Sequence, residues 1–183
     1  MEEENIRQLL SQFCIITKSK LTTFTFTQDY DFICEFRTAY DEKDEKSPSE
    51  FCDRIINEFG DVTSTNWIVR YSFPNAQRLK YRKVYVCQHS AHNKIVTRKR
   101  NDTRIRDKNC KAQIDIKIKV TTRNSIRKDS MLKEGLNTII KVSIIGIPAI
   151  IVLKRSGYSG VTRHFAPPRI FFGAPIPHIK SFF

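Results

Sequence analysis

The sequence predicts an α+β fold in which one helix packs on a four-stranded antiparallel sheet, with an N-terminal extension and an irregular C-terminal tail. Two observations predict it: a helix start signal at Ser47-Pro48, and four segments with strand character between residues 67 and 147. The third of these segments alternates without a break, with apolar side chains at Ala112, Ile114, Ile116, Ile118 and Val120 and polar ones at Lys111, Gln113, Asp115, Lys117 and Lys119. We therefore expect a half-buried sheet with a mostly cationic outer face.

Residues 1–46 are expected to form an acidic segment with a helix, a strand and a linker. Apolar residues spaced by three and four predict an amphipathic helix over residues 2–13, at Ile6, Leu9, Leu10 and Phe13. The run 21–27 mixes β-branched and aromatic residues, which predicts a strand. The mixed-charge run 41–46 predicts a solvated linker, and we place a domain boundary there.

Residues 47–143 are expected to form the main domain. Ser47 suits a helix N-cap, Pro48 the first helical position, and Glu50 the capping-box position. The helix should end before Gly60, a natural left-handed stop, and bury a stripe made by Phe51, Ile55 and Phe59. Strands are expected over residues 67–72, 81–88, 111–120 and 137–147. Their aromatic side chains are interpreted as core residues rather than as base-stacking groups: Trp67, Tyr71, Tyr81 and Tyr85.

Residues 144–183 are expected to form an irregular, apolar tail, because prolines interrupt it without a helical or strand period. The longest apolar run, residues 142–153, is shorter than the roughly 20 residues of a membrane-spanning helix. The acidic start at residues 1–4 is unlike a signal peptide. We therefore expect an intracellular protein with no membrane partner.

The net charge of +13 is unevenly distributed along the chain. It is −7 over residues 1–66, +15 over residues 67–133 and +5 over residues 134–183. A strongly basic segment attracts polyanions, which favours nucleic acid as the partner over a small-molecule substrate. The alternative is a solvated cationic surface without a specific partner. Candidate phosphate contacts are Lys80, Arg82 and Lys83, and, in the basic loop 97–108, Arg98, Lys99, Arg100, Arg104 and Arg106.

Enzymatic activity is not expected. The chain has no Gly-rich phosphate loop, no Gly-x-Ser-x-Gly elbow and no His-Glu-x-x-His helix, and it has only four histidines. Cys14 and Cys34 lie in apolar or strand-like contexts that are typical of buried thiols rather than nucleophiles.

Cys87 and Cys110 are candidate metal ligands. Five cysteines, an odd number, favour unpaired thiols or metal ligands over disulfides. Zinc takes about four thiolate or imidazole ligands, normally as two close pairs, and Cys87 and Cys110 would each belong to such a pair. Alternatively, both cysteines are buried thiols and the nearby His89 and His92 are solvated, which the spacing alone favours because it is not a standard ligand pattern.

The region 47–142 resembles the zinc-binding DNA-binding domain of Mutator-like transposases and their FAR-RED impaired response relatives. The residues that carry the likeness are Trp67-Ile68-Val69-Arg70, the run 79–90 with Cys87, and Asn109-Cys110-Lys111-Ala112. The region is also similar to the N-terminal domains of SWIM zinc-finger proteins, and these domains belong with the WRKY and FLYWCH zinc fingers. The resemblance implies a WRKY-like four-stranded sheet held by zinc through two cysteines, matched by Cys87 and Cys110, and a final His-x-His.

The resemblance ends before the two histidines, because Ser143-Ile144-Ile145-Gly146-Ile147-Pro148 follows Val142. A one-nucleotide shift in codons for Asn-His-Arg-His-Pro would give the residues at 144–148. This permits the hypothesis that residues 144–183 are an out-of-frame or alternatively spliced tail; the alternative is a genuine apolar extension. The zinc site is expected to be incomplete, with His89 or His92 as a makeshift third ligand.

The sequence therefore predicts a transposase-derived module that binds nucleic acid and has a degenerate zinc site. The resemblance implies that the nucleic acid is DNA and that the protein is nuclear. The alternative is a protein-interaction or vestigial transposon-derived module that does not bind DNA. A complete transposase would also need a catalytic domain with several acidic metal ligands.

Overall fold

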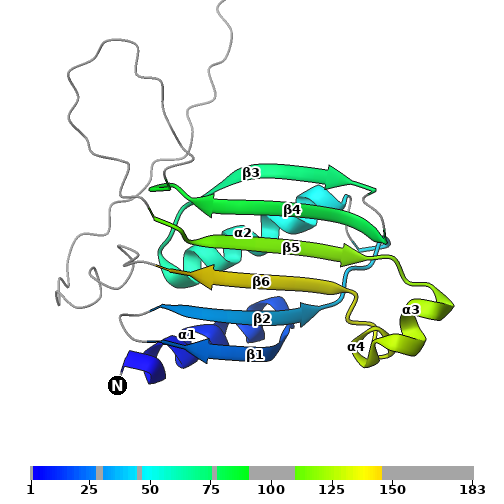
Figure 1. The fold of residues 1–183 in the computed structure, drawn as a ribbon, viewed down its shortest axis with the longest axis horizontal. Coiled ribbons are helices and arrows are strands. Elements are labelled where there is room, and N and C mark those ends of the chain that lie inside the picture. Colours follow the sequence, from blue (N-terminus) through cyan, green and yellow to red (C-terminus); the bar gives the residue numbers. More distant parts are fainter. Residues whose placement is uncertain (1, 28–30, 45–46, 76–77, 91–109, 146–183) are drawn as a thin grey trace, which may run out of the picture.

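The computed structural model describes residues 2–27, 31–44, 47–75, 78–90 and 110–145. Their elements in chain order are α1 (Glu2–Thr17), β1 (Lys20–Phe26), β2 (Phe32–Thr38), α2 (Pro48–Thr63), β3 (Trp67–Pro74), β4 (Leu79–Cys87), β5 (Gln113–Lys119), α3 (Arg123–Lys128), α4 (Ser130–Lys133) and β6 (Thr138–Ile144). The strands form one antiparallel sheet in the order β1-β2-β6-β5-β4-β3 (Figure 1). The α+β class is as predicted.

The sheet has six strands where the sequence predicted four. The strand that the prediction overlooked, β2, pairs with β6 along its whole length, from Phe32 opposite Ile144 to Thr38 opposite Thr138. Phe32, Cys34 and Phe36 are buried, as period-two alternation requires, but the exposed apolar Ile33 between them interrupts the alternation of apolar and polar residues. Residues 1–46 and 47–143, treated as two units in the sequence analysis, thus contribute strands to the same sheet.

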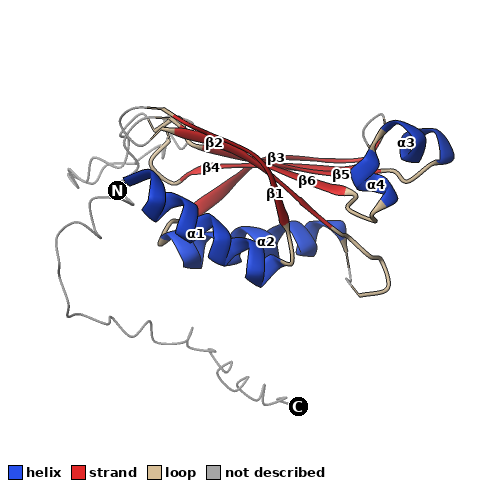
Figure 2. Cartoon of the chain, turned by 90° about the horizontal axis from the view of Figure 1, so that it is seen from below, coloured by secondary structure: helices blue, strands red, loops and turns tan. Residues whose placement is uncertain are grey.

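Helices α1 and α2 pack side by side on one face of the sheet (Figure 2). Phe13 of α1 lies at their junction, with its ring centroid 5.0 Å from that of Phe36 on β2 and 5.2 Å from that of Phe59 on α2, both edge-on. Aromatic rings prefer this edge-to-face arrangement. Phe51, Ile55 and Phe59 are buried as predicted, so α2 belongs to the core.

The start of α2 is as predicted, but its end is not. Ser47 Oγ accepts a hydrogen bond from the Glu50 amide at 3.2 Å. The helix continues through Gly60 to Thr63 and ends at Ser64, whose φ of 56° is left-handed. Gly60 instead serves close packing: a Cβ there would lie 2.7 Å from the Thr65 carbonyl oxygen. The predicted stop at Gly60 is wrong, because a glycine near a helix end serves either a stop or a close contact, and both require the absence of a side chain.

The opposite face of the sheet, here called the outer face, has no helix across it among the described residues (Figure 2). The predicted alternation in β5 is present: Ile114, Ile116 and Ile118 are buried toward the helices. Two details differ from the prediction, because Asp115 is buried on the outer face and Val120 beyond the strand is exposed. Within the described ranges, no helix is both long and apolar enough to cross a membrane.

Candidate nucleic-acid interface

Three strand ends meet at one end of the sheet, here called the cysteine end. β4 ends at Cys87, Cys110 lies shortly before the first residue of β5, and β6 ends at Ile144. The Cys87 amide donates to the Ala112 carbonyl at 3.2 Å, and the Cys110 amide donates to the His89 carbonyl at 3.3 Å. The ladder between β4 and β5 therefore continues to both cysteines, and residues 90, 110 and 145 leave or enter the sheet at this end.

Most of the net positive charge of the chain lies in two segments that join the sheet at the cysteine end. Residues 91–109, between β4 and β5, carry seven Lys/Arg against two Asp, and residues 146–183, after β6, carry five Lys/Arg and no acid. These two segments together account for +10 of the net charge of +13. The predicted phosphate contacts in the first segment lie outside the described residues: Arg98, Lys99, Arg100, Arg104 and Arg106.

The two candidate zinc ligands lie close together. Cys87 and Cys110 are both buried, and the His89 amide donates to Cys87 Sγ at 3.4 Å. Burial raises the pKa of the Cys87 thiol to about 11, the His89 amide opposes this shift, and the neighbouring Cys110 thiol adds to it. Among the described residues no three His, Cys, Asp or Glu side chains are grouped as a metal site, and His92 lies outside them.

Lys83, a predicted phosphate contact, lies on the helix side of the sheet. Its ammonium donates to both carboxylate oxygens of Asp53 on α2 at 2.8 Å and to Ser49 Oγ at 2.9 Å. The Tyr85 hydroxyl donates to Asp53 Oδ1 at 2.8 Å. The Lys83 side chain is only 7% exposed, so its charge stabilises the contact between α2 and β4.

Arg82 points to the outer face, as a phosphate contact would. Its Nε and Nη2 donate to the two carboxylate oxygens of Asp115 at 2.9 and 2.8 Å. This paired hydrogen bond raises the pKa of Arg82 and orients the guanidinium group, and Nη1 is not used in it.

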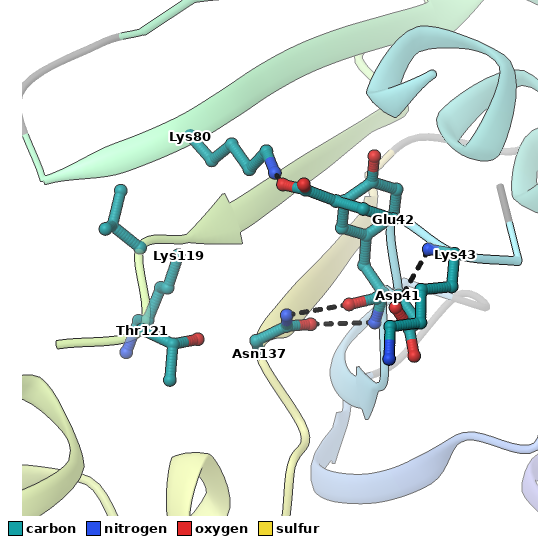
Figure 3. Close-up of a pocket in the computed structure, with 9 residues that line it drawn as sticks. Asp41, Glu42, Lys43, Lys80, Lys119, Thr121 and Asn137 are labelled. Carbon is teal, nitrogen blue, oxygen red and sulfur yellow. Dashed lines mark hydrogen bonds and ion pairs between the residues drawn. The ribbon is translucent and has the colours of Figure 1, made fainter. Parts of the chain in front are cut away.

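Lys80 lies at the opposite end of the sheet. It forms an ion pair with Glu42, and its Nζ is 5.3 Å from the centroid of the Tyr40 ring. Lys80, Glu42 and Tyr40 line a cavity of about 460 Å³ together with Asn137 (Figure 3). The Asn137 side-chain oxygen accepts a hydrogen bond from the Tyr40 amide at 2.7 Å, and its side-chain nitrogen donates to the Tyr40 carbonyl at 2.9 Å. The residues that line this cavity carry charges of both signs. The three predicted phosphate contacts do not form one cluster, because Lys80 lies at a sheet end, Arg82 on the outer face and Lys83 on the helix side.

The strand registers place five outer-face residues side by side across the sheet. Phe73 is opposite Arg82, Arg82 opposite Lys117, Lys117 opposite Ile139 and Ile139 opposite Arg37. We call Phe73, Arg82, Lys117, Ile139 and Arg37 the outer row. At spacings of about 4.8 Å per strand, this row spans roughly 19 Å.

An aromatic pair lies at the β3 end of the outer row. The ring centroids of Tyr71 and Phe73 are 5.0 Å apart, and the guanidinium carbons of Arg70 and Arg82 lie 5.7 and 5.9 Å from the Tyr71 centroid. Tyr71 is therefore not the core aromatic that the sequence analysis expected, although Tyr81 and Tyr85 are buried and Trp67 packs edge-on against Phe59. The spacing Tyr71-Ser72-Phe73 puts both rings on one face, which is the signal that sequence reasoning missed.

Comparison with known proteins gives no match: no family model, no curated protein and no solved structure is significantly similar to this chain.

Proposed function

We propose that this chain is a nucleic-acid-binding module whose affinity comes mainly from the two cationic segments attached at the cysteine end of the sheet. The observation that carries the proposal is the placement of +10 of the net charge in segments that join the sheet at this one end. Each cation that neutralises a phosphate releases a condensed counterion, which makes binding by strongly cationic segments salt-dependent.

The outer face of the sheet supports the same proposal with a smaller charge. The cations on its strands include Arg37, Arg82, Lys117, Lys119, Lys141 and Lys20, against Glu35 and Asp115, with Asp129 and Glu134 beside them. Positive potential therefore extends from the cysteine end over the sheet.

The resemblance to Mutator-like transposase domains supplies the remaining parts of the proposal: DNA as the nucleic acid, a transposase-derived origin, and a nuclear location. It also implies zinc. Cys87 and Cys110 fit two of the four ligands, because their thiols are neighbours at the ends of paired strands, but the described residues supply no third ligand. We expect substoichiometric zinc, which metal analysis of the purified chain tests.

A salt titration tests nucleic-acid binding. The logarithm of the affinity falls with the logarithm of the salt concentration by about 0.9 for each phosphate neutralised on duplex DNA. Replacing Arg98, Lys99, Arg100, Arg104 and Arg106 with Gln should reduce this slope by several units. An unchanged slope would show that the basic loop takes no part, and the absence of binding at low salt would overturn the function itself.

A second candidate function is protein interaction through the edge strand β3. Ile68, Val69 and Phe73 are exposed on this strand, and an unprotected apolar edge is a template for pairing with another strand. Sedimentation across a range of protein concentrations separates the two functions, because strand pairing between copies depends on protein concentration and not on nucleic acid.

A further inference from the structure

Phe73 is an apolar residue in charged surroundings. It is 48% exposed on the outer face, and its cross-strand neighbour is Arg82. No described helix lies across the outer face at β3 (Figure 2). A bound group with a flat apolar face would cover the Phe73 ring and remove its apolar area from water, which favours binding. The guanidinium carbons of Arg70 and Arg82 lie over the neighbouring Tyr71 ring, so cationic groups border the exposed Phe73 ring.

We propose that the outer row binds single-stranded nucleic acid, with Phe73 stacking on an unpaired base and Arg82 and Lys117 contacting phosphates. This inference rests on the proposed function and adds the class of ligand. Stacking on exposed aromatic side chains combined with a cationic track is the usual way in which proteins hold single strands.

The arrangement favours a single strand over a duplex for a steric reason. The faces of bases in a duplex are covered by neighbouring base pairs, so a protein ring reaches them only where the bases are unpaired. At β3 and β4 the outer face is a sheet surface on which no described helix lies (Figure 2).

The order of residues along the row matches a polynucleotide that crosses the strands. The aromatic pair is at β3, and the cations Arg82 on β4 and Lys117 on β5 follow. Arg37 at the β2 end is paired with Glu35 and Asp129, so the track ends at β5. Asp115 holds Arg82 and also lies 3.1 Å from Lys117 Nζ, so it fixes both cations at the surface. Because the bond to Asp115 uses Nε and Nη2, Arg82 presents Nη1 to a phosphate without giving up its carboxylate partner.

The experiment compares three probes of equal phosphate number: a mixed-sequence single strand of about 12 nucleotides, an abasic strand and a hairpin duplex whose loop is abasic. Each is titrated against the full chain and against Phe73→Ala. We expect the variant to lose about tenfold in affinity for the single strand and less than about twofold for the duplex and the abasic strand, which have no accessible base faces. Phe73→Trp should bind the single strand at least as well as the original chain does.

Ile68→Ala is the matched control, because Ile68 lies on the same strand and face and is 44% exposed, but has no ring. It should leave all three affinities unchanged, and thermal unfolding should show that each variant is folded. Equal binding of the single strand by Phe73→Ala and the original chain would overturn the inference and leave the proposed function standing. A change in the oligomeric state of Phe73→Ala without a change in affinity would also overturn it, in favour of a protein interface. Failure of the original chain to bind any probe would instead overturn the proposed function.

Discussion

Lys83 and Asp53 form an ion pair whose two members differ in exposure, and this asymmetry gives a quantitative prediction. The Lys83 side chain is 7% exposed and the Asp53 side chain 47%. Asp53→Ala leaves a buried ammonium without its carboxylate and also removes the acceptor of the Tyr85 hydroxyl. Lys83→Met leaves a carboxylate that water already reaches, with the Tyr85 bond intact.

We expect Asp53→Ala to lower the free energy of unfolding by about 3 kcal/mol, at the lower end of the cost of breaking a buried ion pair, because the pair is partly hydrated. Lys83→Met should cost less than about 1 kcal/mol, since an apolar side chain of similar length fills the site. Asp53→Asn should fall between them, because its amide oxygen still accepts from Tyr85.

Urea unfolding monitored by the fluorescence of Trp67, the one tryptophan, measures these losses, since this ring packs against Phe59 in the core. A loss for Lys83→Met that equals or exceeds the loss for Asp53→Ala would refute the reasoning. The affinity of Lys83→Met for nucleic acid should also stay within about twofold of the original, because the ammonium faces α2.

Three further changes test the fold. Gly60→Ala, which would stabilise an ordinary helix by about 1 kcal/mol, should instead destabilise by about 1–3 kcal/mol because the new Cβ meets the Thr65 carbonyl; a stabilised variant in urea unfolding would contradict this. Phe59→Ala should cost about 3–5 kcal/mol, since the ring is fully buried, and a loss below about 1 kcal/mol would place α2 outside the core. The hydrogen bond from Lys119 is the main cause of the lowered pKa of Asp129. The ionised carboxylate therefore stabilises the fold above about pH 4, and this stabilisation is lost as the pH falls through the lowered pKa. Asp129→Asn should therefore make stability less dependent on pH in acid, and identical acid unfolding curves would show that the pair contributes nothing.

The elements with a strong local pattern were predicted from the sequence. The alternation in β5 and the cap at Ser47 are set by side chains close in sequence, and the structure has both. The partners of β1 and β2 were not predictable in the same way, because the pairing of β2 with β6 joins residues about 100 positions apart. Periodicity identifies a strand but does not say which strand it pairs with.

The candidate site was predictable in part. Charge arithmetic identified the cationic segments, but it does not distinguish a cation that faces solvent from one that faces a helix. Lys80, Arg82 and Lys83 are close in sequence, yet they lie at a sheet end, on the outer face and on the helix side. Only the pleat of β4 and the position of Asp53 on α2 decide which of them a phosphate reaches.

The central position of β6 has a consequence for the order in which the sheet is completed. β1 and β2 follow one another along the chain, as do β3, β4 and β5. Among the described residues the two groups meet only through β6, which is the last described strand to be synthesised. During synthesis the β2 edge therefore waits for about 100 further residues, or roughly 5–20 s at cellular elongation rates, with its backbone unpaired on that side. Such an edge is exposed to pairing with other chains, so we expect nascent or C-terminally truncated chains to aggregate through β2.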